Sequence, residues 1–219
     1  MKYTLPLAGL IALSLVCAEA SAAVFERDWK TPGDGLLTYD DVSGREWLDL
    51  SVSLLSDQFP GVDREAKYQY VAGQTASDGL FAGFSIARRE DVIALAQSAG
   101  IDTTSLDRSI NFTPTRLLQE LLSVTHYFPS SDSRLAIGLI NELSPPPPIT
   151  RRVSASFLDL PQSGGNGSTG LQISVSHTEF PAIPPGVMLY RTAVPEPHGF
   201  AQLLVYVVTF LVARHLRGF

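Results

Sequence analysis

The sequence predicts an α+β fold: a β-rich single globular domain with two central helices, plus an N-terminal signal helix and a C-terminal transmembrane helix. Three observations support this prediction. Short apolar segments bounded by Gly, Asp and Pro, which are typical of strands and turns, recur through residues 23–193. Two stretches in the middle of that region have apolar residues at helical spacing. Finally, each end of the chain carries an apolar run without charged residues.

The N-terminal segment, residues 1–22, has the three-part order of a secretory signal peptide. A positive start is followed by the apolar residues 4–16 and then by small residues. The small residues that define the cleavage region are Ala20, Ala22 and Ala23. About thirteen apolar residues are too few to span a bilayer comfortably, so we expect cleavage after Ala22 and export of the domain. Two alternatives stay open, an uncleaved anchor and lipid attachment at Cys17.

Within the domain, the first predicted feature is a β-hairpin. Residues 36–39 and 45–50 are apolar runs on either side of a turn rich in Asp and Gly. We expect Trp47, Leu48 and Leu50 to supply part of the core. Further strands are predicted over residues 81–86, 135–140, 151–160, 171–177 and 186–192.

Two central helices are predicted between these strands. Residues 89–99 show a helical apolar face, and Gly100 is placed to end that helix. Thr113 and Pro114 are predicted to open the second helix, whose leucines follow at helical spacing. The proline-rich residues 144–148 and the Gly/Ser-rich residues 163–168 are predicted to be loops.

Composition restricts the chemistry of this domain. The chain has 219 residues, of which 45% are hydrophobic, and its formal net charge is −6. Phosphate binding needs clustered Lys and Arg, which the interior of the chain lacks, so we expect no nucleic-acid partner. The single cysteine, Cys17, lies within the signal segment. A processed chain therefore has no thiol, which excludes a disulfide, a thiolate zinc site and a cysteine nucleophile.

The C-terminal segment is predicted to enter the membrane. Residues 199–213 are uncharged and apolar, and a basic cluster follows them at once, consisting of Arg214, His215 and Arg217. Basic residues after an apolar run keep that end cytoplasmic, which agrees with an exported domain. The helical length of this run is only about 22 Å, against about 30 Å for the hydrocarbon core. A transient anchor suits that length better than a permanent one.

A short motif precedes the apolar run: Val194, Pro195, Glu196 and Pro197. The two prolines hold this segment extended, as a protease cleft requires. The motif, the apolar run and the terminal arginines together resemble the PEP-CTERM sorting signal over residues 194–219. The resemblance implies recognition by an exosortase, a membrane-embedded cysteine protease of exopolysaccharide-producing Gram-negative bacteria. It also implies cutting near the motif and transfer to the cell envelope surface or the extracellular matrix.

A second resemblance covers residues 33–100. The order Gly-Leu-Leu-Thr-Tyr-Asp, Gly-Arg-Glu-Trp-Leu-Asp-Leu and Gly-Phe-Ser-Ile-Ala-Arg-Arg-Glu-Asp-Val is similar to a domain that recurs among PEP-CTERM proteins. It implies no particular activity.

The domain shows no catalytic motif, so we predict no catalytic residue, no metal and no cofactor. Serines lack the G-x-S-x-G context, and histidines lack an H-x-x-x-H spacing. The densest acidic cluster is Asp40, Asp41, Glu46 and Asp49. It is open to three interpretations: a Ca²⁺ site, a carboxylate pair for glycoside cleavage formed by Glu46 and Asp49, or ordinary turn chemistry. Aromatic residues that could form a carbohydrate platform, or else core, are Tyr68, Tyr70, Phe81, Phe84 and Tyr127.

We therefore expect a non-enzymatic, exported protein that is tethered to the inner membrane in transit and then sorted to the envelope surface or matrix. The expected partners are an exosortase, the membrane and, as a further candidate, exopolysaccharide. The alternative function is a secreted hydrolase that uses acidic residues of the central domain.

Overall fold

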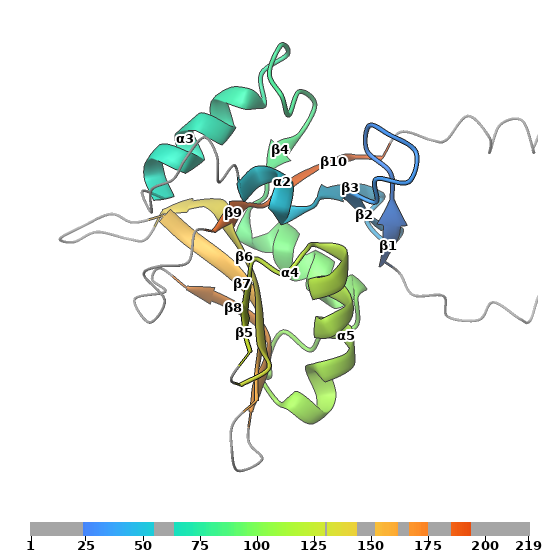
Figure 1. Ribbon diagram of the computed structural model, residues 1–219, viewed down its shortest axis with the longest axis vertical. Helices are drawn as coiled ribbons and strands as arrows, with labels where there is room; N and C mark the ends of the chain where they lie inside the picture. The colour runs from blue at the N-terminus through green and yellow to red at the C-terminus, as the bar shows by residue number, and fades with distance from the viewer. Residues whose placement is uncertain are drawn as a thin grey trace, which may run out of the picture.

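Two β-sheets and four helices make up the described part of the chain (Figure 1). The computed structural model describes residues 24–54, 64–129, 131–143, 152–161, 167–174 and 185–193. The predicted α+β class and the β-rich single domain are confirmed. The predicted number of two helices is wrong, because four helices lie within these ranges. None of the helices in these ranges is both long enough and apolar enough to cross a membrane.

Several predictions fall outside the described ranges. These are the signal helix with its cleavage residues Ala20, Ala22 and Ala23, the loop at residues 144–148, and the tail from Val194 to the end of the chain. They stay predictions from the sequence.

Sheet A is antiparallel throughout and has the strand order β1-β2-β3-β10-β4. Its strands are β1 (Val24–Arg27), β2 (Leu37–Asp40), β3 (Arg45–Leu48), β10 (Leu189–Thr192) and β4 (Ser85–Ile86). The predicted hairpin is confirmed as β2 and β3, although β3 ends at Leu48 and Leu50 begins a helix. The expected core residues Trp47, Leu48 and Leu50 are at most 1% exposed.

Sheet B has the order β5-β6-β7-β8, and a short strand, β9, pairs in parallel with β6. Its strands are β5 (His126–Phe128), β6 (Ser133–Leu143), β7 (Arg152–Leu160), β8 (Ser168–Ser174) and β9 (Gly186–Val187). The strands predicted over residues 135–140 and 151–160 are confirmed as parts of β6 and β7. The strand predicted over residues 171–177 starts earlier than predicted, because β8 begins at Ser168, within the predicted loop; residues 175–177 lie outside the described ranges.

The strand predicted over residues 186–192 is broken at Met188 into β9 and β10, which belong to different sheets. The Met188 backbone N–H donates to the carbonyl of Leu139 in β6 at 3.0 Å. Its carbonyl accepts from the Ala87 N–H, next to β4, at 2.8 Å. One residue therefore joins the two sheets through its backbone, which an apolar pattern in the sequence cannot reveal.

The four helices are α2 (Leu50–Leu54), α3 (Arg64–Gln74), α4 (Arg89–Ser98) and α5 (Arg108–Leu121). The first predicted helix is confirmed as α4, and Gly100 follows it with a φ of +88°, a conformation that favours glycine.

The second predicted helix, α5, begins at Arg108 rather than at Thr113. Asp107 caps it, because its carboxylate accepts from the Ser109 backbone N–H at 2.8 Å. Pro114 therefore lies inside the helix, where it removes one backbone donor, instead of opening it. The predicted strand over residues 81–86 is also wrong in its first half. Phe81 to Phe84 form a turn, and only Ser85 and Ile86 pair in a sheet.

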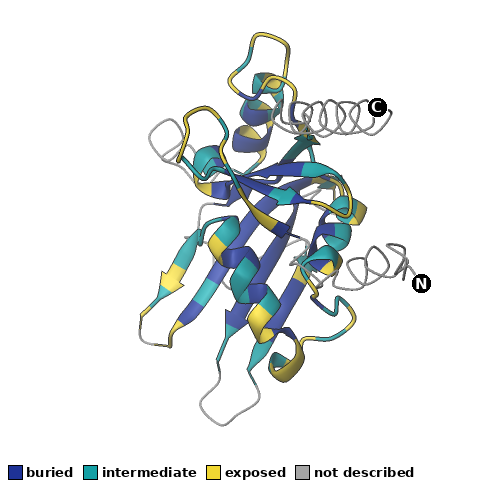
Figure 2. Ribbon diagram, turned by 90° about the vertical axis from the view of Figure 1, so that its right-hand side faces the viewer, coloured by how far each residue is buried: buried dark blue, intermediate teal, exposed yellow. Residues whose placement is uncertain are grey.

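The main hydrophobic core lies between α4, α5 and the inner face of sheet B, and Trp47 of sheet A contributes to it. A second cluster packs α3 and the turn at Phe81 against the other face of sheet A. Figure 2 shows the buried residues concentrated on the sheet strands and along the helix sides that face them.

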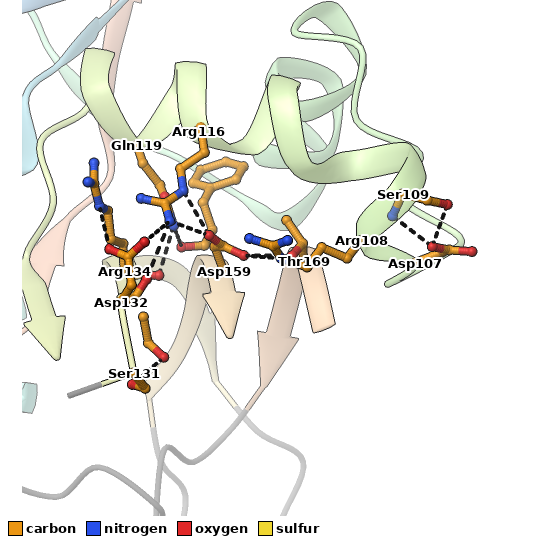
Figure 3. Close-up of polar contacts among 12 residues, drawn as sticks. Asp107, Arg108, Ser109, Arg116, Gln119, Ser131, Asp132, Arg134, Asp159 and Thr169 are labelled. Carbon is orange, nitrogen blue, oxygen red and sulfur yellow. Dashed lines mark hydrogen bonds and ion pairs between the residues drawn. The ribbon is translucent and has the colours of Figure 1, made fainter. Parts of the chain in front are cut away.

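A buried carboxylate fixes α5 to sheet B (Figure 3). Asp159 of β7 is 0% exposed. Its two oxygens accept from Nε of Arg108 at 3.1 Å and from Nε of Arg116 at 2.7 Å, and Oγ1 of Thr169 adds a third bond at 2.9 Å. Both arginines come from α5 and Thr169 from β8, so this carboxylate ties one helix to two strands.

The first described strand, β1, begins at the same end of sheet A at which the last one, β10, finishes. Val24 of β1 lies opposite Asp40, Asp40 lies opposite Arg45, and Arg45 lies opposite Thr192 of β10. These four residues form one row across the sheet. At about 4.8 Å per strand, Val24 and Thr192 are about 14 Å apart.

The loop between β1 and β2 is organised around one carboxylate. Asp34 accepts backbone hydrogen bonds from Trp29, Lys30, Thr31 and Leu36 at 2.8 to 3.3 Å. These bonds, that from Trp29 first, lower the pKa of Asp34 from 3.8 to about 2. The carboxylate therefore contributes stability above its ordinary pKa and loses that contribution as the pH falls through about 2.

Replacing Asp34 by alanine is expected to open this loop without unfolding the sheets. The backbone N–H groups of Trp29, Lys30 and Thr31 lose their acceptor, so their hydrogen exchange should accelerate at least tenfold while that of β2 and β3 is unchanged. Asp41, an exposed acid in the neighbouring turn, provides the control substitution, Asp41→Ala. Unchanged exchange at Trp29 in Asp34→Ala, or a carboxyl titration of Asp34 at its ordinary value, would contradict this account.

Candidate functional site

The acidic cluster predicted from the sequence is dispersed in the structure. The Asp40 carboxylate accepts from the Val42 and Ser43 backbone N–H groups and from the Ser43 hydroxyl, at 2.6 to 3.2 Å. The interpretation of Asp40 as a turn-forming residue is therefore confirmed. Asp49 instead accepts from the Ser51 N–H and the Ser123 hydroxyl. Within the described ranges, no three His, Cys, Asp or Glu side chains are grouped to hold a metal ion.

Glu46 lines a polar hollow of about 530 Å³ together with Phe25, Glu26, Arg27 and Asp28. Asp49 does not line it, so the proposed pair of Glu46 and Asp49 is not brought together there.

Carboxylates of this hollow are already engaged by hydrogen bonds within the protein. The two oxygens of Glu46 accept from Arg27 at 3.3 Å and from Arg191 at 2.8 Å. Asp28 accepts from the backbone N–H groups of Gly33 and Gly35. The Glu26 carboxylate lies against Gly35, where an added Cβ atom would come within 2.7 Å of its Oε1. Among the described residues, this hollow gives no facing pair of free carboxylates.

The aromatic residues named from the sequence do not form one exposed platform. Phe81, Phe84 and Tyr68 are buried in the second hydrophobic cluster, and Tyr70 packs partly against it. Tyr127, on β5, is 48% exposed and lies on the other sheet.

A second hollow, of about 470 Å³, lies where five elements meet: α3, β4, the start of α4, β6 and β10. Its lining is predominantly polar. The side chains that give it hydrogen-bonding capacity are Tyr68, Ser85, Arg88, Asp91, Asn141 and Tyr190, and also Thr75, whose hydroxyl already donates to the Ala72 carbonyl. This hollow has more uncharged donors and acceptors than the one at Glu46, together with a charged side chain, and we take it as the candidate functional site.

Part of the lining is fixed by bonds within the protein. The Tyr68 hydroxyl donates to Oδ1 of Asn141 at 2.8 Å, and burial raises the pKa of Tyr68, which keeps that proton in place. Asp91 is paired with Arg45 at 2.8 Å and also accepts from the Arg88 backbone N–H. The rest of the lining is unengaged: the hydroxyls of Ser85 and Tyr190, the amide nitrogen of Asn141 and the Arg88 guanidinium have no partner among the described residues.

Sequence reasoning named only one residue of this site that reaches the hollow with a polar atom, Tyr68. The others come from segments distant in the chain, from Ser85 to Tyr190, and no spacing connects them. The one local signal is the pair Arg88 and Arg89 at the start of the helix predicted over residues 89–99, because the helix dipole does not favour arginines there.

The remaining predicted site residues lie outside the described ranges. They are the sorting motif at Val194, Pro195, Glu196 and Pro197 and the basic cluster at Arg214, His215 and Arg217. Comparisons with protein-family models, with curated proteins and with solved structures find no match to this chain.

Proposed function

We propose that the chain is an exported, non-enzymatic protein that is tethered to the inner membrane in transit and sorted by an exosortase to the envelope surface or matrix. The observation that carries this proposal is the row from Val24 to Thr192 at one end of sheet A. The predicted signal cleavage after Ala22 falls two residues before that row, and the sorting motif begins two residues after it.

The proposal gives the domain a definite orientation during transit. The chain leaves the domain toward the tail at the same end of sheet A at which the mature chain begins. While the tail is in the membrane, this end of sheet A faces the bilayer. The parts of the domain that lie away from this end of sheet A then face partners outside the membrane, among them exopolysaccharide.

The alternative of a secreted hydrolase finds less support. Hydrolysis of a glycosidic bond needs two carboxyl groups that face the same bond from opposite sides. Glu46 is the one sequence-predicted acid that lines a hollow, and two arginines occupy its oxygens. A hydrolase of this kind should lose its activity in Glu46→Gln.

The sorting motif provides the direct test. In a host that has an exosortase, replacing Pro195, Glu196 and Pro197 by alanine is expected to prevent processing of the tail, because the segment loses its extended shape and its carboxylate. The unprocessed protein should stay in the membrane fraction, and mass spectrometry should show that it keeps residues 198–219.

The matched control replaces the prolines at 145–147 by alanine, because these lie in another proline-rich segment of the same chain. That variant should be processed normally. A tail variant with the same mature mass and the same location as the unmodified protein would refute the proposal.

A further inference from the structure

The hollow between α3, β4, α4, β6 and β10 offers a charged and hydroxyl-lined site that the sorting function does not use. From its geometry we infer that it binds one acidic sugar unit, a polyhydroxylated ring that carries a carboxylate, with Arg88 holding the carboxylate. Its volume of about 470 Å³ lies within the range of small-molecule sites and admits one or two sugar rings.

Hydroxyl groups both donate and accept hydrogen bonds, so a site for them mixes the two capacities. The Ser85 and Tyr190 hydroxyls can do both, and the amide nitrogen of Asn141 donates. The carbonyl oxygen of that amide already accepts from Tyr68, which fixes the direction of the amide. Three unengaged polar groups in one hollow match the alternating hydroxyls of a sugar better than an apolar ligand.

The charge of the ligand follows from the arginines around the hollow. Arg45 is paired with Asp91, Arg89 with Glu142, and Arg152 with Glu65, at 2.7 to 2.9 Å. Within each of these three pairs, the positive charge of the arginine is balanced by the negative charge of its carboxylate. Arg88 lines the hollow, is exposed, and has no ion-pair partner among the described residues. A guanidinium in this position favours an anionic group, and its fork matches a carboxylate.

The faces of the aromatic rings show which mode of sugar binding is open. The guanidinium of Arg152 lies 3.5 Å from the centre of the Tyr68 ring. The Tyr190 ring carries Arg45 at 4.4 Å and packs on Trp47 at 5.3 Å. Because these rings already have partners, stacking of a sugar on them is obstructed. Recognition therefore depends on hydrogen bonds and charge, which favours an acidic sugar over a neutral one.

The walls of the hollow are held in place without a ligand. The Asn141 backbone N–H donates to the Ala87 carbonyl at 2.7 Å, and the Ala87 N–H donates to the Met188 carbonyl at 2.8 Å. These bonds connect β6, the segment before α4, and the joint between β9 and β10. A site built in advance spends little of its binding free energy on ordering.

The chain carries its own reporter of binding. It has two tryptophans, and each contacts a ring that lines the hollow: Trp47 packs on Tyr190, and Trp29 packs edge-on against Phe84 at 5.9 Å. The full chain, purified in detergent, is titrated with trigalacturonate as the acidic probe and with galactotriose as the neutral probe. We expect saturable quenching or enhancement of tryptophan fluorescence by trigalacturonate, with at least tenfold weaker binding of galactotriose.

Three variants test the roles of the residues. Arg88→Ala should weaken trigalacturonate binding at least tenfold, and Arg88→Glu should abolish it. Arg134→Ala, which removes a partly exposed arginine of sheet B far along the chain, should bind as the unmodified chain does. Equal affinity for both probes, no binding of trigalacturonate, or an Arg88→Ala variant with full affinity and an unchanged melting temperature would overturn the inference.

The source of the sugar, an exopolysaccharide outside the cell, rests on the proposed export, whereas the binding itself does not. The two can fail separately. If the chain binds trigalacturonate in vitro but is not processed in the host, the sugar site stands and the proposal of sorting is refuted. If the chain is processed normally but binds neither probe, the proposal of sorting stands and the sugar site is refuted.

Discussion

Replacing Asp159 by alanine is expected to lower the free energy of unfolding by about 3 to 5 kcal/mol, one of the two largest effects that we foresee for a single residue. The carboxylate is 0% exposed and binds Arg108, Arg116 and Thr169. Its removal leaves the Arg116 guanidinium, whose side chain is only 13% exposed, without its closest acceptor. Chemical denaturation followed by circular dichroism measures the change.

Asp132 gives a matched control, because it also pairs with Arg116, at 3.5 Å, but its side chain is 62% exposed. Asp132→Asn should cost less than about 1 kcal/mol, as loss of a surface ion pair does, because asparagine also tolerates the left-handed backbone at this position, where φ is +49°. If the two variants were equally stable, the burial of Asp159 would not stabilise the protein. The proposed role of this carboxylate in holding α5 against sheet B would then be refuted.

Replacing Trp47 by alanine is expected to have the second large effect, lowering the free energy of unfolding by about 3 to 5 kcal/mol. The side chain is 1% exposed, lies in the main core and packs on Tyr190 of β10. Its removal leaves a cavity between sheet A and the helices, which the backbone cannot close because β3 is paired on both sides. Thermal and chemical denaturation give the size of the loss.

Trp47→Phe separates the ring from its N–H group. The indole nitrogen is buried and has no acceptor among the described residues, so phenylalanine removes an unpaired donor along with some volume. We expect this variant to lose less than half of what Trp47→Ala loses. Trp29→Ala, at a position that is only partly buried, should also be milder. An alanine variant of Trp47 as stable as the unmodified chain would refute its role in the core.

The parts of the fold that the sequence predicts well are those decided by local chemistry. The hairpin of β2 and β3 has an Asp-rich turn between two apolar runs, and α4 has a helical face with a glycine behind it. The sequence predicts too late a start for α5, because Pro114 is a stronger helix-start signal in the sequence than the capping carboxylate of Asp107. Helix α3, with few apolar residues, has a weak pattern and was not predicted.

The candidate site cannot be predicted from the sequence, for a different reason. Its residues lie on five elements, and their proximity depends on how β10 returns between β3 and β4. The pairing of an arginine depends on the tertiary structure: Arg88 and Arg89 are neighbours in the chain, yet Arg89 binds Glu142 while Arg88 has no ion-pair partner among the described residues. The acidic cluster shows that residues close in the chain need not form one site. Asp40, Glu46 and Asp49 each accept hydrogen bonds from different residues.

The position of β10 also sets the order in which the domain can assemble. The last strand of the domain lies inside sheet A, between β3 and β4, and Met188 just before it connects the sheets. Until residues 186–192 arrive, β3 is an open edge and β4 has no neighbour in the sheet. A chain that emerges from its N-terminus therefore stays incomplete until almost all of it has emerged. If the chain is exported as we propose, the late strand delays folding, because sheet A is completed only after residues 186–192 have crossed the membrane.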